Sequence, residues 1–244
     1  MADIDLLSVT AADGRDLLAA AQMDWTRPVP HCPGWDAAAL VGHMGAILAW
    51  MDKIVTTGER VSRRDRETPP AGPAALAAWY SDHLDGTLRV LTATPADSPA
   101  WTFSSLGEQR AGWWRRRLAV ELAIHRWDAQ HAADVPPRPL DGDVARAGIE
   151  EFLTEFLPGL LAPPEVTGLD GSLHLHATDE PGEWLVDLSA RAGVTAQAGH
   201  AAADTTVAGT RSDLLLWLTN REPGPSITIT GADGLTAAWG QLRR

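Results

Sequence analysis

The sequence contains a single cysteine, Cys32, among 244 residues. One cysteine excludes an internal disulfide framework and fits a reducing compartment. Lysine is equally rare, because Lys53 is the only one and all other basic residues are arginines. The 20 basic residues are outnumbered by 32 acids, which gives a formal net charge of −12. Such a charge repels phosphate backbones, so we expect no nucleic-acid partner.

The sequence also lacks a long uncharged apolar stretch. The longest one runs from Ala37 to Met51, includes His43, and is shorter than the roughly 20 apolar residues that a membrane span needs. The first residues include acids where a secretory signal peptide would carry bases. We therefore expect a cytoplasmic protein without a membrane partner.

What the sequence does contain is typical of a folded globular protein, with 45% hydrophobic and 21% charged residues. Proline and glycine clusters separate four segments before residue 135 that are long enough to be helices, at about 5–23, 37–57, 73–91 and 112–133. The second is the clearest, since Asp36 can cap its start, apolar residues recur at three- and four-residue steps, and Gly58 can end it. The first is weaker because Gly14 interrupts it. These segments predict a helical bundle.

Beyond Pro158 the hydrophobic period changes. Alternation over 172–177, 183–189 and 226–230 predicts half-buried strands. Short helices are expected at 213–219, capped by Ser212, and at 233–242, with a connecting helix near 143–157. We therefore predict two domains, an all-helical one at 1–158 and a small α+β one at 159–244.

Glu121 and His125 are the clearest candidates for chemistry. They are four residues apart on the fourth predicted helix, so their side chains lie on one face with Cβ atoms about 5–6 Å apart. His43 lies on the apolar stripe of the second helix, where an imidazole needs a partner. If these two helices are neighbours, the three side chains converge inside the bundle, as metal ligands do in helical bundles.

Two imidazoles and one carboxylate suit zinc best and leave a fourth position open for water or substrate. Nickel, cobalt or ferrous iron accept the same donors. Two other interpretations stay open. In one, a fourth ligand such as His83 or Cys32 closes the site and the protein is a non-enzymatic metal-binding or sensing module. In the other, no metal binds and Glu121 satisfies His43.

The segment HCPGWDAAALVGHMGAILAW, at 31–50, and the later segment VELAIHRWDAQ resemble the mycothiol-dependent maleylpyruvate isomerase family. The resemblance covers most of the chain and is most specific in the first domain. It implies a DinB-like four-helix bundle followed by a small α/β domain. It also implies metal ligands at His43, Glu121 and His125, the three residues that spacing indicates.

The resemblance further implies mycothiol as a thiol cosubstrate and Arg221 as a catalytic residue close to the active site. The alternative role for Arg221 is a cation that stabilises a helix C-terminus. A metal-bound thiol loses its proton near neutral pH and becomes a nucleophile. We therefore expect a metal-dependent enzyme, an isomerase of the maleylpyruvate type or a thiol S-transferase, acting on a small electrophile as a monomer or homodimer.

Three further residues have simpler explanations in the sequence. Asp128, three residues after His125, is expected to be a carboxylate on the helix surface beside Arg126. The alternative is that it orients a neighbouring ligand. His174 and His176 share one face of a predicted strand, and we expect them to be exposed to solvent without a metal.

Overall fold

The computed structural model describes residues 6–162, 168–189, 195–222, 224–231 and 233–242. The chain divides into two compact units, Met1–Val144 and Ala145–Arg244. The domain boundary predicted at residue 158 falls inside a short helix, α6 (Leu157–Leu161). The segment before α6 packs with the second unit, since the ring of Phe152 lies 6.1 Å from that of Trp239.

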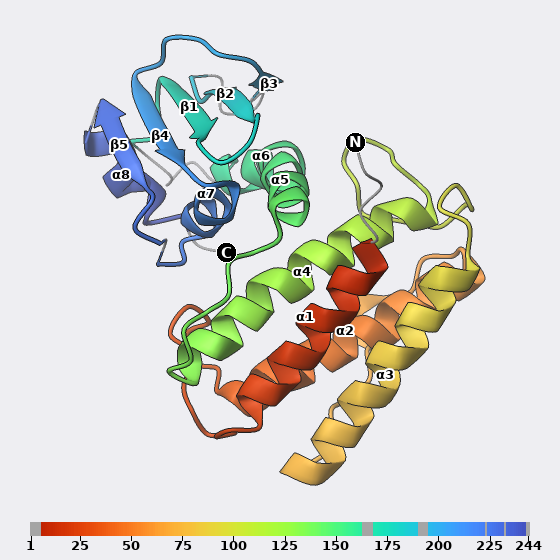
Figure 1. Cartoon of the computed structure of the whole chain (residues 1–244). Coiled ribbons are helices and arrows are strands. Elements are labelled where there is room, and N and C mark those ends of the chain that lie inside the picture. Colours follow the sequence, from red (N-terminus) through yellow and green to blue (C-terminus); the bar gives the residue numbers. More distant parts are fainter. Residues whose placement is uncertain (1–5, 163–167, 190–194, 223, 232, 243–244) are drawn as a thin grey trace. The chain divides into compact units, whose positions relative to one another are not determined.

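The first unit is a bundle of four long helices, as the sequence predicts (Figure 1). A single turn of 3-10 helix, η1 (Arg63–Asp65), follows the second of them. Helix α1 packs mainly on α4, and α2 packs on both α3 and α4. The bundle helices are α1 (Leu6–Ala21), α2 (Ala37–Thr57), α3 (Pro73–Ala93) and α4 (Ala111–Ala132).

The ends of α2 are set by the residues that the sequence indicates. The Asp36 carboxylate accepts a hydrogen bond of 2.8 Å from the backbone N–H of Ala39, which satisfies one of the free donors of the first turn. Gly58 ends the helix with a φ of 74°, a left-handed conformation that glycine adopts without steric cost. Both predictions for this helix are confirmed.

Gly14 does not interrupt α1, contrary to the expectation from sequence. A Cβ atom at this position would lie 2.8 Å from the Leu84 side chain of α3, so glycine permits the two helices to approach closely. The hydroxyl of Tyr80, also on α3, donates a 2.9 Å hydrogen bond to the Gly14 carbonyl. This glycine is explained by helix packing.

The register between α2 and α4 is fixed by two buried tryptophans. The rings of Trp50 on α2 and Trp114 on α4 lie 5.4 Å apart in an edge-to-face arrangement. Trp50 lies about two helical turns after His43, and Trp114 about two turns before Glu121. Because the two helices run in opposite directions, this contact aligns His43 with Glu121.

Helix α2 is long and apolar enough to cross a membrane by length and composition alone. The length argument based on Ala37–Met51 was too strict, because the helix continues to Thr57. However, 72% of its apolar 18-residue stretch is buried inside the protein, as expected for the central helix of a bundle. Packing therefore accounts for its composition.

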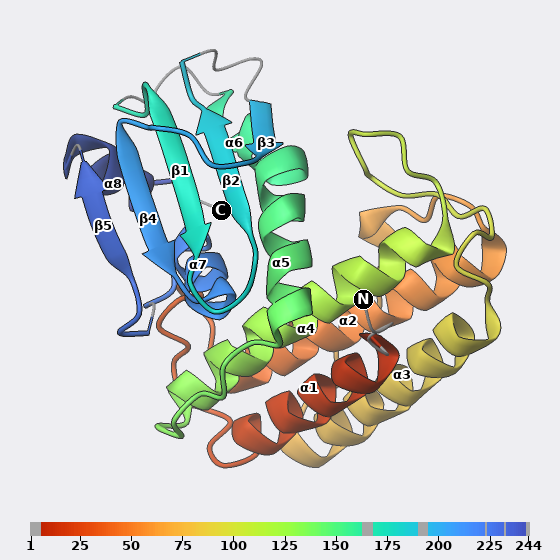
Figure 2. The ribbon, with the colours of Figure 1, turned by 45° about the horizontal axis from the view of Figure 1, so that its top comes forward.

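The second unit contains a five-stranded mixed sheet in the order β3-β2-β1-β4-β5, visible in Figure 2. Strands β1 and β4 are parallel and the other neighbours are antiparallel. Helices α7 (Arg211–Leu218) and α8 (Asp233–Trp239) pack together through the stacked rings of Trp217 and Trp239. The strands are β1 (Ser172–Ala177), β2 (Glu183–Asp187), β3 (Thr195–Ala198), β4 (Thr205–Gly209) and β5 (Thr228–Gly231).

The connecting helix is less regular than predicted. It begins as α5 (Gly142–Glu151), passes through a π-helical turn, η2 (Phe152–Phe156), and ends as α6. Pro158 directly follows the π-helical turn, and because it has no N–H and its ring clashes with the preceding turn, it explains the irregular hydrogen bonding there. The cap of α7 is also a correction, because the Thr210 hydroxyl rather than that of Ser212 accepts the N–H of Asp213.

Together these elements form an N-terminal helical bundle followed by a small mixed α/β unit. The predicted fold class is confirmed.

Candidate metal centre

Three ligand atoms from two helices converge in the first unit. His43 comes from α2, and Glu121 and His125 come from successive turns of α4. The Nε2 atoms of both imidazoles lie 3.7 Å from Oε1 of Glu121, and the ligand atoms of the three residues all lie within 4.8 Å of one another. The structure therefore brings together the three residues that spacing singled out. Their assignment as metal ligands stays a prediction.

The centre is shielded but open to solvent on one side. The side chains of His43, Glu121 and His125 are 27%, 15% and 10% exposed. The ring of Trp35 lies 4.6 Å from that of His43 and 6.3 Å from that of His125. Most of the exposure thus belongs to His43, on the side of α2.

A second carboxylate holds His125 in place. Oδ2 of Asp128 lies 2.9 Å from Nδ1 of His125, which leaves Nε2 directed toward Glu121. Metal-binding histidines commonly donate their other N–H to such a carboxylate, which fixes the tautomer and the ring orientation. Asp128 is 0% exposed, so the expectation of a helix-surface carboxylate was wrong. It belongs to the inner face of α4, one turn after His125.

Arg117 holds the other oxygen of Glu121. Its guanidinium pairs with Oε2 of Glu121, one turn away on α4, while Oε1 faces the imidazoles. Burial alone would raise the pKa of Glu121, but Arg117 and the two imidazoles hold it well below its usual range. The carboxylate is therefore ionised, as a metal ligand must be.

The groups around His125 raise the pKa of its imidazole. Burial alone would lower the pKa of His125, but the hydrogen bond to Asp128, followed by Cys32 and Glu121, raises it well above its usual range. The two carboxylates therefore favour the protonated form of this imidazole when no metal is bound.

Neither proposed fourth ligand joins these three residues. Cys32 lies with His125 and Asp128, its Sγ 3.7 Å from Oδ2 of Asp128. His83 pairs with Glu67 at 3.0 Å. Among the described residues, the group around Glu121 has three members. This arrangement favours a site with an open position over a closed one.

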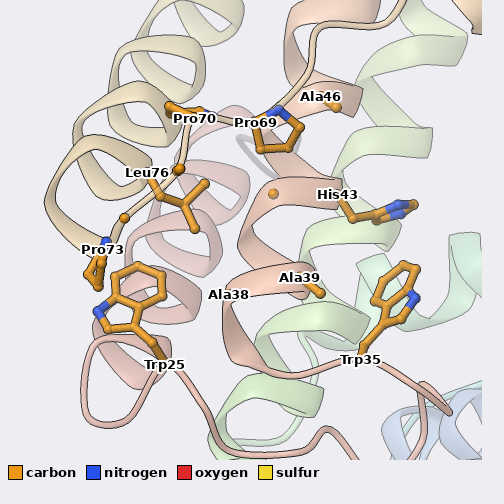
Figure 3. A pocket seen from close by; sticks show the side chains of 13 residues that line it. Trp25, Trp35, Ala38, Ala39, His43, Ala46, Pro69, Pro70, Pro73 and Leu76 are labelled. Carbon is orange, nitrogen blue, oxygen red and sulfur yellow. The ribbon is translucent and has the colours of Figure 1, made fainter.

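A pocket of about 530 Å³ lies beside His43, within the size range of small-molecule sites. Figure 3 shows the rings of His43 and Trp35 next to each other, and the side chains of Trp25, Pro73 and Leu76 grouped together. Among the residues that the structure describes, His43 is the one ionisable residue that lines the pocket. A ligand there would contact mostly apolar side chains.

Arg221, the predicted catalytic residue, follows α7 in the second unit. Its backbone N–H donates to the Leu216 carbonyl at 2.8 Å, and its guanidinium donates to the Thr219 carbonyl at 2.9 Å. These contacts fit the alternative role as a cation at a helix C-terminus. A catalytic role for Arg221 stays a prediction.

The expectation for the histidines of β1 was wrong in part. His174 is 3% exposed, whereas the side chain of His176 is 40% exposed. Both rings lie close to Glu183 of β2. This contact arises from the pairing of β1 with β2, which hydrophobic periodicity does not specify.

Two family models match the chain in order. The mycothiol maleylpyruvate isomerase N-terminal domain matches residues 7–130, and the C-terminal domain of the same family matches residues 143–238. A comparison with curated proteins gives no significant match.

Solved structures share the fold at low sequence identity. A crystal structure of the mycothiol-dependent maleylpyruvate isomerase is 13% identical, with a TM-score of 0.61 over 93% of this chain and 92% of that one. A mutant of that isomerase in which one histidine is replaced by alanine is 14% identical, with a TM-score of 0.60 and the same coverage. Since the first domain model alone spans about half of the sequence and the second follows it, the chain belongs to the mycothiol maleylpyruvate isomerase family.

Proposed function

We propose that this protein is an enzyme in which His43, Glu121 and His125 hold a divalent metal, best zinc, that activates a low-molecular-weight thiol. Mycothiol is the thiol that family membership favours. The observation that carries the proposal is the convergence of three ligand atoms from α2 and α4, without a fourth protein ligand among the described residues.

The geometry of the three residues fits one shared ion better than direct contact. Two ligands bound tetrahedrally to zinc at about 2.0–2.1 Å are about 3.3 Å apart. The observed 3.7 Å from Glu121 Oε1 to each Nε2 is close to this spacing, but too long for an N–H···O hydrogen bond. The metal-free interpretation, with His43 satisfied by Glu121, therefore has less support.

A divalent metal bound there would supply Lewis acidity that lowers the pKa of a bound thiol to near neutral pH. The surrounding residues prepare for this role. Oδ2 of Asp128 accepts a hydrogen bond from Nδ1 of His125, and Arg117 pairs with the outer oxygen of Glu121. The apolar pocket beside His43 offers a place for the carbon skeleton of a substrate.

The family and the similar structures favour isomerisation of maleylpyruvate. In that reaction the thiolate sulfur adds to the cis double bond, the resulting single bond rotates, and elimination of the thiolate restores the double bond as trans. A thiol S-transferase would use the same nucleophile and retain the new carbon–sulfur bond. The residues of the metal centre serve both outcomes.

A single experiment separates the two activities. Purified protein loaded with zinc is mixed with mycothiol and a panel of electrophiles that includes maleylpyruvate, and the products are examined by mass spectrometry. Conversion to fumarylpyruvate with recovery of free mycothiol identifies an isomerase, whereas a stable thioether identifies a transferase. Neither product with any electrophile would contradict the proposal.

Removing one ligand tests whether the activity depends on the metal centre. His43→Ala is expected to abolish turnover while the far-ultraviolet circular dichroism of the bundle is preserved. The matched control is His83→Ala, which replaces a histidine that pairs with Glu67 outside the centre. Equal turnover of the His43→Ala variant and the control would remove His43 from the mechanism.

A non-enzymatic metal-binding or sensing module is the second candidate. It would hold the ion with the same three residues and need a closed fourth position. Neither His83 nor Cys32 joins the group around Glu121, so this candidate has less support.

A further inference from the structure

A second cluster of potential metal ligands lies in the sheet unit, on three segments that are separate in the sequence. It consists of His174 and His176 of β1, Glu183 at the start of β2, and His200 just after β3. One ligand atom from each residue lies within 4.8 Å of every other. The cluster therefore brings together three imidazoles and one carboxylate.

Sheet geometry places these side chains together. His174 and His176 are two residues apart on β1, so they lie on the same face. Glu183 is the direct partner of His176 in the antiparallel pairing of β1 with β2. The Gly199 N–H donates to the Glu183 carbonyl at 3.1 Å, which brings His200 to the same place.

The distances leave one nitrogen without a hydrogen bond. Nδ1 of His176 lies 3.0 Å from Oε1 of Glu183, and Nδ1 of His200 lies 2.8 Å from Oε2. Nε2 of His174 lies 3.4 Å from Oε2 of Glu183, and this buried atom has no hydrogen-bond partner among the described residues. A buried polar atom without a partner is costly, so it indicates a ligand.

His174 cannot turn to solvent to satisfy this nitrogen, because its side chain is 3% exposed. Its ring lies 5.0 Å from the ring of His200, edge to face. The Glu183 carboxylate already faces His176 and His200 with its two oxygens. A cation between the four residues would satisfy the His174 nitrogen and the carboxylate together.

We propose that His174, His176, Glu183 and His200 form a second zinc site, distinct from the centre in the helical bundle. Three nitrogens and one oxygen complete a tetrahedral shell, which is typical of a structural site that has no open position. The site would link β1, β2 and the segment after β3, and so hold one edge of the sheet together. This proposal does not depend on the proposed function.

The test counts zinc in a background that lacks the first site. The His43→Ala variant is freed of metal with a chelator and titrated with zinc in competition with a chromophoric chelator. We expect it to bind one equivalent. Adding His200→Ala removes one of four ligands and is expected to weaken zinc binding by about 10-fold or more, since a lost ligand costs at least as much as a charged hydrogen bond. The protein should stay folded, because the His200 side chain is 76% exposed. Circular dichroism checks that both variants are folded.

The matched control adds His83→Ala to His43→Ala, and it should keep the one equivalent. Absence of zinc binding by the His43→Ala variant, or equal binding after His200→Ala is added, would overturn the second site and leave only a hydrogen-bonded cluster. The two substitutions are also tested one at a time. If the unsubstituted protein binds only one equivalent of zinc, and His200→Ala weakens that binding whereas His43→Ala does not, the result would support this site and contradict the metal centre of the proposed function.

Discussion

At the scale of single residues, Asp128 is a buried carboxylate that orients one ligand of the proposed metal centre. Its Oδ2 lies 2.9 Å from Nδ1 of His125 and 3.7 Å from Sγ of Cys32. It therefore fixes the orientation of an imidazole without belonging to the three proposed ligands. Replacing such a side chain should therefore weaken metal binding without removing any of the three proposed ligands.

Asp128→Asn is expected to weaken zinc binding at the helical centre by about 10–100-fold, as loss of such outer partners commonly does. The amide keeps the size of the carboxylate but loses its charge and changes the tautomer of His125 that it favours. Chelator competition measures the effect, with Asp85→Asn as the control because that carboxylate is exposed and pairs with Arg15. Unchanged affinity in the Asp128 variant would contradict its orienting role.

Tyr80 is the only tyrosine of the chain, so its ionisation can be observed alone. Burial, reinforced by Asp13, raises the pKa of its phenol far above the usual value of about 10. Below about pH 10 the phenol is protonated in both the folded and the unfolded protein, so the stability that its burial contributes is fully present there. Above that pH only the unfolded state ionises, so stability falls as pH rises, by about 1.4 kcal/mol per unit.

We therefore predict that the folded protein shows no tyrosinate absorbance near 295 nm at pH 10–11, and that this absorbance appears together with unfolding. An alkaline difference spectrum recorded alongside circular dichroism measures both. Ionisation near pH 10 in the folded protein would show that the Tyr80 hydroxyl is accessible.

At the scale of elements, α1 and α4 are joined by a buried ion pair. Nε of Arg126 lies 3.2 Å from Oδ1 of Asp13, and both side chains are at most 1% exposed. Arg138 also pairs with Asp13 at 2.7 Å. Removal of one partner from such a pair leaves a buried charge without compensation.

Asp13→Ala should therefore lower the free energy of unfolding by about 3–5 kcal/mol. The control is Asp16→Ala, which removes an exposed partner of Arg138 and should cost about 1 kcal/mol or less. Urea denaturation of both variants makes the comparison. Similar losses in the two variants would show that the Asp13 pair does not join these helices as described.

The elements also show what the sequence could and could not predict. The caps of α2 were predictable because Asp36 and Gly58 act through their own backbone neighbourhood. Strand β4 was missed because its buried positions, Thr205, Val207 and Gly209, include only one strongly apolar side chain. Alternation of hydrophobicity is therefore hardly visible there.

The candidate sites also contain contacts that the sequence could predict and contacts that it could not. The proximity of Glu121 and His125 follows from helical spacing, and His43 joins them once α2 lies beside α4. The contact of His174 with Glu183 depends on strand register, and His200 follows a short strand that has little pattern of its own. Sequence periodicity shows which faces are buried but does not specify which strands pair.

At the scale of the whole molecule, the predicted catalytic role of Arg221 in the second unit can be tested by substitution. If its guanidinium binds an anionic substrate group, Arg221→Ala should lower kcat/KM by about 10–100-fold, the value of a charged hydrogen bond, while zinc content stays unchanged. Arg146→Ala is the control, since Arg146 forms an exposed pair with Glu150. Unaltered kinetics with a small loss of stability would leave Arg221 as a helix-terminal cation.

The proposed metal centre of the bundle is tested most directly by anomalous X-ray scattering. Crystals grown with zinc are measured on both sides of the zinc absorption edge. We predict an anomalous peak about 2.0–2.2 Å from His43 Nε2, Glu121 Oε1 and His125 Nε2, with no fourth protein ligand. Absence of a peak between these atoms in zinc-replete crystals, or a peak closed by a fourth side chain, would contradict an open catalytic centre.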